Sequence, residues 1–174
     1  KMKKKLNKNS IYLKPINKYH IDKGWLKWIT KKSVYNNTGT NPKNFNKKKL
    51  KNYIKDLKKI KMGSHGTKVR SLMFAVYDSH THKYFGNLRL NNIDFVHKHC
   101  SYGRLVGEND YKNKGYGRLM LYKICELAFE KMKLNKVFSY VYADNKESVL
   151  SNKKFGMKIE GFLKKHNIKN KKSK

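Results

Sequence analysis

The sequence GENDYKNKGYGR, residues 107–118, joins a predicted strand to the longest predicted helix of the chain. Its two glycines, Gly115 and Gly117, permit a tight turn and a close approach of the backbone to a ligand. The N–H groups at the helix start would then face outward, where the helix dipole and the basic residues of the loop favour an anion. We interpret the stretch as a cradle for a diphosphate. A glycine turn that only caps the helix is the alternative, because Gly-x-Gly alone is a weak signal.

Before this loop, hydrophobic periodicity predicts four strands and two helices. The second helix is amphipathic and is predicted to end near Gly63. Residues 34–45 contain Gly39, Pro42 and several Asn, so they are predicted to form a loop. The predicted strands are 11–16, 72–77, 84–94 and 101–106, the helices are 20–30 and 50–60, and a turn at 79–82 joins the two middle strands.

After the loop, apolar residues at helical spacing predict a helix over 115–134. Alternation predicts a strand over 137–142 and a final strand over 157–163, with a short helix over 145–155 between them. The predicted order is therefore β-α-α-β-β-β-α-β-α-β. Mixed strands with a few helices indicate an α/β layered domain.

Charge is the most unusual bulk property of the 174-residue chain, which has 43 Lys and Arg against 11 Asp and Glu and a formal net charge of +32. Such an excess attracts anions, and nucleic acid, ribosomes and acidic membranes are possible partners. Only four of the basic residues are Arg, and Asn is common, so AT-rich codon usage is an alternative source of the Lys excess. Codon usage does not account for the scarcity of Glu.

Cys100 and Cys125 are the only cysteines, and we interpret both as free thiols in a reducing, cytoplasmic setting. No run of about 20 apolar residues exists, so no membrane span is predicted. The start of the chain is basic without the apolar stretch of a signal peptide. The expected organisation is a mobile basic segment at 1–9, one domain at 10–164 and a mobile basic tail at 165–174.

Two segments carry a resemblance to a known family. The stretch Lys112–Gly117 resembles the pyrophosphate motif of GNAT acetyltransferases, Gln/Arg-x-x-Gly-x-Gly/Ala, with Lys in the first position. Asn145–Ser148 and Lys154–Met157 resemble the second GNAT signature, Asn-x-x-Ser/Ala followed by Lys-x-Gly-Phe, with Met in place of Phe. The resemblance covers about Ile11 to Leu163 and is greatest to the branch that contains ribosomal-protein N-terminal acetyltransferases and amino-sugar acetyltransferases. It is also carried by Phe85–Leu88, Gly107-Glu108 and Ile159–Gly161.

The resemblance implies the GNAT fold, a mixed central sheet of about six to seven strands flanked by four helices, and acetyl-CoA as co-substrate. It implies that backbone N–H groups of Asn113–Arg118 hold the diphosphate, and that the strand at Leu105–Gly107 pairs with the pantetheine arm. An N–H near Val106 would polarise the thioester carbonyl. Asn145 would bind the pantetheine arm, although its position also suits a helix N-cap. The implied cofactor-binding residues are Leu105, Val106, Gly107, Lys112, Asn113, Lys114, Gly115, Tyr116, Gly117, Arg118, Asn145, Ser148 and Asn152.

Acetyl transfer to an amine also needs proton transfer. Many GNAT members protonate the departing thiolate with a Tyr, whose aligned position here is Asn152, so this acid is missing. Glu108 is the first candidate for the base, with a surface carboxylate paired to a Lys as the alternative. His97 and His99 are the second candidates, because a His titrates near neutral pH. No metal is predicted, since no Cys or carboxylate cluster accompanies the His-x-His pairs.

The resemblance therefore predicts transfer of an acetyl group to a primary amine, with the amino group of a nucleotide-linked sugar as the leading acceptor. A ribosomal-protein or peptide N-terminus is the alternative, and a polyamine fits least because the positive chain would repel it. Two alternatives are not enzymes: a nucleic-acid-binding module, and a degenerate acetyltransferase fold kept for binding alone. The charge supports nucleic-acid binding, but no helix-turn-helix, zinc-finger or aromatic RNA-binding signature is present. The oligomeric state is left open.

Overall fold

A mixed β-sheet forms the centre of the molecule in a computed structural model, which describes residues 7–38, 41–62, 66–166, 168–169 and 172–173. Within these residues the sheet has six strands in the order β1-β3-β4-β5-β6, and β2 pairs with the other end of β3. All neighbours are antiparallel except β5 and β6, which are parallel. The strands are β1 (Ile11–Pro15), β2 (Lys61–Met62), β3 (Lys68–Asp78), β4 (Tyr84–Asp94), β5 (His99–Val106) and β6 (Lys136–Phe138).

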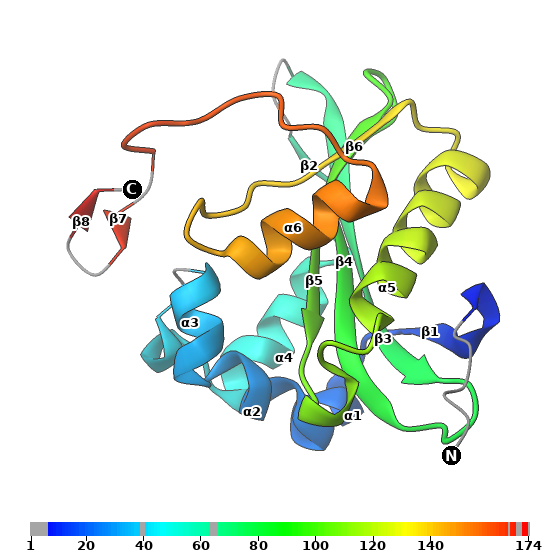
Figure 1. Cartoon of the computed structure of the whole chain (residues 1–174), viewed down its shortest axis with the longest axis vertical. Coiled ribbons are helices and arrows are strands. Elements are labelled where there is room, and N and C mark those ends of the chain that lie inside the picture. The colour runs from blue at the N-terminus through cyan, green and yellow to red at the C-terminus, as the bar shows by residue number, and fades with distance from the viewer. Residues whose placement is uncertain (1–6, 39–40, 63–65, 167, 170–171, 174) are drawn as a thin grey trace.

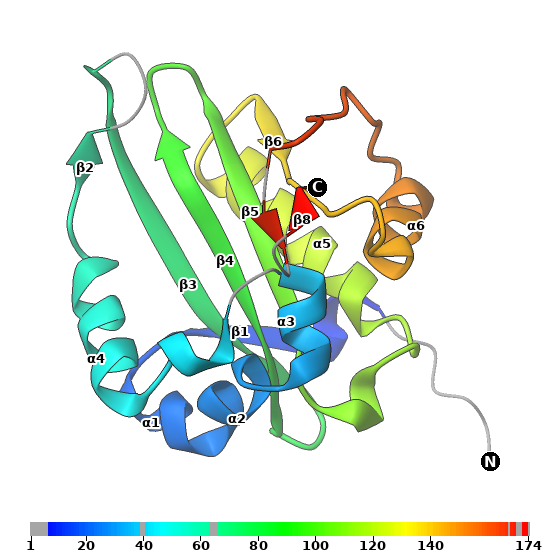
Figure 2. The ribbon, with the colours of Figure 1, turned by 90° about the vertical axis from the view of Figure 1, so that its left-hand side faces the viewer.

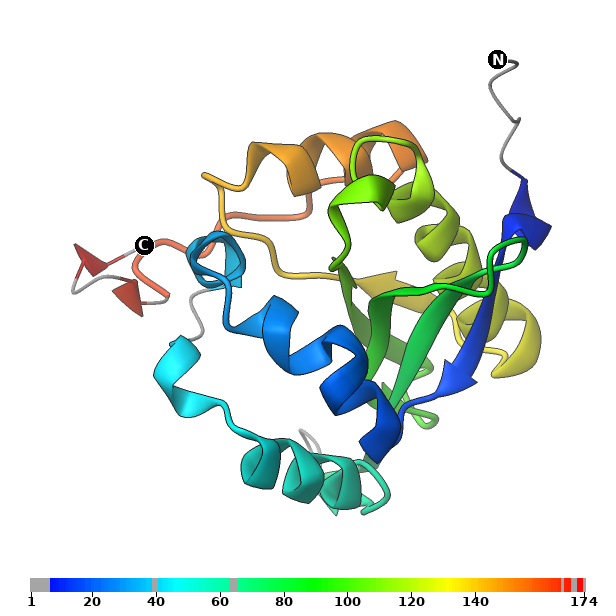
Figure 3. The same cartoon turned by 90° about the horizontal axis from the view of Figure 1, so that it is seen from below.

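Helices cover both faces of this sheet, so the molecule has three layers (Figures 1 and 3). One face packs against α5 (Tyr116–Cys125), its π-helical continuation η6 (Glu126–Lys131), and α6 (Lys146–Phe155). The opposite face carries the helices of the N-terminal third of the chain (Figure 2). These are α1 (Lys18–His20), the π-helical turn η2 (Ile21–Trp25), α2 (Leu26–Ile29), α3 (Lys32–Thr38) and α4 (Lys47–Asp56).

Each face has its own hydrophobic cluster. Under α5 the buried side chains include Leu88, Leu90 and Met120, all 0% exposed. Under the N-terminal helices they include Trp28 and Ala75. The β3–β4 hairpin forms as predicted because the Asp78 carboxylate accepts hydrogen bonds from the N–H groups of the turn that follows it.

Three predicted elements differ from the structure. Residues 34–45 are not a continuous loop, because α3 extends to Thr38 and a 3₁₀ turn, η3 (Pro42–Asn44), follows. Pro42 begins that turn, a position where proline is favoured; Gly39 lies outside the described residues. Beyond Phe138 the predicted strand 137–142 is coil, and no strand forms over 157–163 among the described residues. Alternation alone is insufficient there, since a strand also needs a neighbour with which to pair.

The number and the boundaries of the helices also differ from the prediction. The described chain has more helical segments than the four expected. The helix predicted over 50–60 is α4 and ends at Asp56, so Gly63, which is outside the described residues, does not end it. Near the two ends of the chain, the described residues form a 3₁₀ turn, η1 (Lys8–Ser10), and a short hairpin of β7 (Ile168–Lys169) and β8 (Lys172–Ser173). The predicted division into a domain and two mobile end segments stays a prediction.

Candidate functional site

The loop before α5 turns sharply because two of its residues have left-handed backbone conformations. Asn113 has φ 57° and Gly115 has φ 90°, and α5 begins at the next residue, Tyr116. Glycine adopts this region freely, and Asn is one of the few other residues that tolerates it. The sequence KNKGYG therefore produces a compact turn that leads directly into a helix start.

This turn leaves a cluster of backbone donors available. Within the described chain, no hydrogen bond uses the N–H groups of residues 113–117. The N–H of Arg118, which the sequence also placed in the cradle, instead donates to the Gly115 carbonyl at 3.0 Å. Lys114 and Arg118 are exposed at the same place and add positive charge. Such unpaired donors at a helix start suit a phosphate or diphosphate.

Aromatic residues anchor the loop to the β3–β4 hairpin. The Tyr116 hydroxyl donates to the Asp78 carboxylate at 2.8 Å, and the Tyr111 ring stacks on Phe85 at 4.3 Å. Burial and the neighbouring Asp78 carboxylate raise the pKa of Tyr116. Burial of Asp78 opposes ionisation, but its hydrogen bonds from Thr81, Tyr116 and His80 outweigh burial and lower its pKa. The anchor therefore joins a neutral phenol to a carboxylate.

Beside the loop, β5 and β6 separate. Their pairing ends at Ser101 and Phe138, and β6 then leaves the sheet. In the described chain, no strand pairs with Tyr102–Val106 on the side away from β4. This edge includes the half-buried residues Leu105 and Val106. The free backbone groups of this edge could bind a ligand in an extended conformation.

Helix α6 lies across this opening from α5, and its polar residues connect to β5. Asn145 accepts a hydrogen bond from the Ser148 N–H at 3.3 Å, so it caps the helix. Asn152 accepts one from Arg104 at 3.0 Å, and the other end of that guanidinium donates to the Gly117 carbonyl. Burial lowers the pKa of Arg104. Asn145, Ser148 and Asn152 share one helix face, as their spacing predicts.

Arg104 is a residue that the sequence analysis missed. It links the start of α5 to α6, and its only sequence signal was an arginine within a predicted strand. A cavity of about 190 Å³ lies further along between the same two helices. Its lining is mostly apolar and includes Tyr102, Phe155 and Met157.

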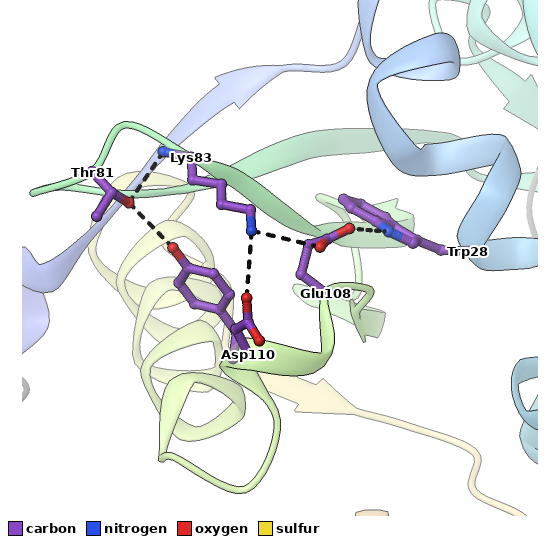
Figure 4. Close-up of polar contacts among 6 residues, drawn as sticks. Trp28, Thr81, Lys83, Glu108 and Asp110 are labelled. Carbon is purple, nitrogen blue, oxygen red and sulfur yellow. Dashed lines mark hydrogen bonds and ion pairs between the residues drawn. The ribbon is translucent and has the colours of Figure 1, made fainter.

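Glu108 follows β5 and is held from two sides (Figure 4). Its Oε1 accepts a hydrogen bond from the Trp28 indole at 2.9 Å, and its Oε2 lies 3.7 Å from the Lys83 ammonium. The preceding residue, Gly107, packs against the same indole so closely that a Cβ there would collide with it. The Gly107 N–H donates to the Phe85 carbonyl at 2.8 Å, so it is not free for a ligand. Both tryptophans of the chain, including Trp25, are core residues.

The structure does not bring His97 and His99 to Glu108. They lie at the opposite end of β5, where the ring of His99 is 5.8 Å from that of Phe138. Val106 lies seven positions after His99 in the strand, which corresponds to about 23 Å at 3.3 Å per residue. Their role as bases stays a prediction without support from this placement.

Among the described residues, no group of three or more His, Cys, Asp and Glu side chains is arranged to hold a metal ion. Within the same residues, every helix is too short or too polar to cross a bilayer.

Known proteins share this fold, and one protein family matches most of this sequence. A family profile described as an acetyltransferase (GNAT) domain matches residues 10–158. A spermidine N-acetyltransferase from Vibrio cholerae in complex with CoA and spermine has a TM-score of 0.79 and 15% identity, over 94% of this chain and 90% of that chain. A chimera of that enzyme with hSSAT has a TM-score of 0.77 and 16% identity, over the same shares. At such identities the likeness concerns the fold. No curated protein sequence matches the chain.

Proposed function

The chain belongs to the acetyltransferase (GNAT) family, and from that premise we propose how its residues bind acetyl-CoA and which amine they acetylate. It is an acetyl-CoA-dependent N-acetyltransferase, with acetyl-CoA as its co-substrate. The family match does not select a branch within the superfamily, so the branch and the acceptor belong to the proposal.

The co-substrate is proposed to lie along the loop and the open edge of β5. The observation that carries this assignment is the set of N–H groups at residues 113–117 that have no acceptor within the described chain. These groups would hold the diphosphate, assisted by the charges of Lys112, Lys114 and Arg118. The pantetheine arm would then pair with β5 near Leu105 and Val106, opposite Asn145, Ser148 and Asn152 on α6. An unpaired N–H of that edge would stabilise the oxyanion that forms at the thioester.

A positioning role for Glu108 fits its contacts better than proton abstraction. One carboxylate oxygen is engaged by the buried Trp28 and the other by Lys83. A general base must reach the amine with a free lone pair. Glu108 instead fixes the end of β5 against α2, which places the start of the cofactor loop.

The acceptor is proposed to be the amino group of a nucleotide-linked amino sugar. Six acidic residues of the described chain form ion pairs with Lys, so their negative charges are already paired with positive ones. The net charge of +32 favours an acceptor that carries its own diphosphate. A polyamine is the second candidate, because similar folds belong to spermidine N-acetyltransferases.

A two-stage experiment tests the proposal. Thermal shift and calorimetry with CoA come first, and binding at about one CoA per chain is expected. CoA release is then followed with uridine- and thymidine-diphosphate amino sugars, ribosomal-protein N-terminal peptides and spermidine. Turnover of the nucleotide sugars alone would support the acceptor. Turnover of only the peptides or only spermidine would replace it, and a failure to bind CoA would contradict the cofactor site itself.

A further inference from the structure

Unsatisfied polar atoms are concentrated in one part of the sheet. Four buried side-chain atoms lack a hydrogen-bond partner among the described residues, and all belong to β4 and β5. They are Nδ2 of Asn87, Nε of Arg89, Oδ1 of Asn91 and Nδ1 of His99. Leaving such atoms unpaired costs stability, so most buried polar atoms in proteins have partners. Their grouping indicates a surface that is completed by a polar ligand.

The register of the sheet places these side chains on one face. Directly opposed residues share a face, and so do residues two apart along a strand. Asn87 lies opposite Ala75 and Leu105, which both belong to the cluster beneath the N-terminal helices. The polar row therefore lies on the sheet face that carries α4, opposite the face that packs against α5. Its opposed pairs on β4 and β5 are Asn87 with Leu105, Arg89 with Gly103, and Asn91 with Ser101.

Arg89 is the centre of this row. Its guanidinium lies 5.1 Å from the centre of the Tyr53 ring of α4, and it forms no hydrogen bond or ion pair with the described residues. Burial raises the pKa of Tyr53, although the charge of Arg89 opposes that effect, so the phenol stays neutral. A cation held by an aromatic ring, with its N–H donors unused, is ready to bind an anion.

The position opposite Arg89 has room for a ligand. Gly103 has no side chain, and a Cβ placed on it would meet no atom within 4 Å. Gly103 also lies two residues beyond Ser101, where the pairing of β5 with β6 ends. A group bound above Gly103 would therefore sit next to the open edge of β5, where the acetyl group is proposed to lie.

We propose that Arg89 binds the diphosphate of the acceptor on the α4 face of β4 and β5, and that it thereby excludes polyamines. A guanidinium binds phosphate through paired N–H donors, whereas it repels an ammonium group. Asn87, Asn91 and Ser101 supply the neutral amide and hydroxyl groups that suit sugar hydroxyls. This assignment rests on the proposed acetyl transfer to a nucleotide-linked sugar and names the residue that selects it.

Binding of thymidine diphosphate to the CoA-saturated protein tests the assignment, because CoA then occupies the loop before α5. Calorimetry should show a site in the unaltered protein. Arg89→Gln should weaken it by about 10- to 100-fold, as expected for the loss of charge-assisted hydrogen bonds. Arg89→Lys should lie between the two. The matched control is Arg70→Gln, since Arg70 belongs to β3 of the same sheet and lies 5.0 Å from the centre of the Phe95 ring, but is outside the polar row.

Kinetics with acetyl-CoA held at saturation add a second readout. Arg89→Gln should raise KM for a diphosphate-linked amino sugar and leave KM for acetyl-CoA unchanged. Arg89→Glu should increase turnover of spermidine relative to that sugar. The assignment is overturned if thymidine diphosphate does not bind the CoA-saturated protein, or if Arg89→Gln binds it as tightly as Arg70→Gln does. Absence of CoA binding would instead contradict the proposed acetyl transfer.

Discussion

At the scale of single residues, Glu108 shows why a carboxylate next to a reaction centre need not act on the substrate. The Trp28 indole is fully buried, and Glu108 Oε1 is the acceptor of its only N–H. The sequence placed Glu108 correctly at the end of β5, because strand and loop patterns are local. The sequence did not indicate that Glu108 contacts Trp28, which lies 80 residues earlier in the chain. The partner that defines the role of Glu108 is therefore non-local.

Substitution of Glu108 separates the two roles. Glu108→Gln keeps an oxygen for the Trp28 N–H, so we expect turnover within a few-fold of the unaltered enzyme. Glu108→Ala leaves that buried N–H unpaired and should lower the free energy of unfolding by about 1–3 kcal/mol. Turnover and thermal unfolding measure the two effects.

Asp110→Asn is the control, because exposed Asp110 also pairs with Lys83 but does not contact Trp28. A loss of 10²-fold or more in turnover of a normally stable Glu108→Gln variant would instead assign the base to Glu108.

At the scale of elements, the predictions from sequence succeeded where local pattern and pairing agree. The β3–β4 hairpin and α5 were predicted, since alternation, turn residues and helical spacing are all encoded locally. The loop at 112–117 was predicted for the same reason. Gly115 in this loop adopts a left-handed backbone conformation, as a glycine in a tight turn predicts. The strand over 157–163 was wrong because its existence depends on a neighbour that β6 does not provide. The face of β4 that carries Arg89 was missed because only the register reveals it.

The loop before α5 provides the prediction at this scale. Gly115→Val forces a β-branched residue into φ 90°, and a side chain at Gly117 would crowd Arg104, whose Nη1 lies 3.3 Å from the added Cβ. The double variant Gly115→Val/Gly117→Val should bind acetyl-CoA at least about tenfold more weakly, since such backbone strain costs on the order of 1–3 kcal/mol. Calorimetry measures the affinity, and circular dichroism verifies the fold.

Gly161→Val serves as the control for the loop variant, because a Cβ on Gly161 meets no atom within 4 Å. Unchanged acetyl-CoA affinity in a folded double variant would show that the diphosphate lies elsewhere.

At the scale of the whole molecule, charge provides a test that does not depend on any one contact. With a net charge of +32, long-range attraction should concentrate an anionic acceptor near the enzyme and repel a cationic one. The total charge was evident from composition alone. The arrangement of acidic side chains was not, since their pairing with Lys depends on the fold.

Ionic strength should therefore act in opposite directions on the two acceptor classes. Raising salt from 0.01 M to 0.1 M shortens the Debye length from about 30 Å to about 10 Å. At low acceptor concentration, turnover of a diphosphate-linked amino sugar should fall, whereas turnover of spermidine should rise as repulsion is screened. The same amino sugar without its nucleotide diphosphate is the control, because it lacks the negative charge. A salt response of the same sign for both acceptors would contradict a role for the net charge in selecting them.

The separation of β5 from β6 has a consequence for association between copies of the chain. In the described residues, Tyr102–Val106 form a strand edge without a partner, and such an edge is a template for pairing with another polypeptide. A bound pantetheine arm would cover that edge, so the co-substrate would protect the enzyme from edge-to-edge aggregation while it is bound. The position of α6, where Asn152 accepts a hydrogen bond from Arg104 of β5, and the excess of lysine would limit the same hazard between catalytic cycles.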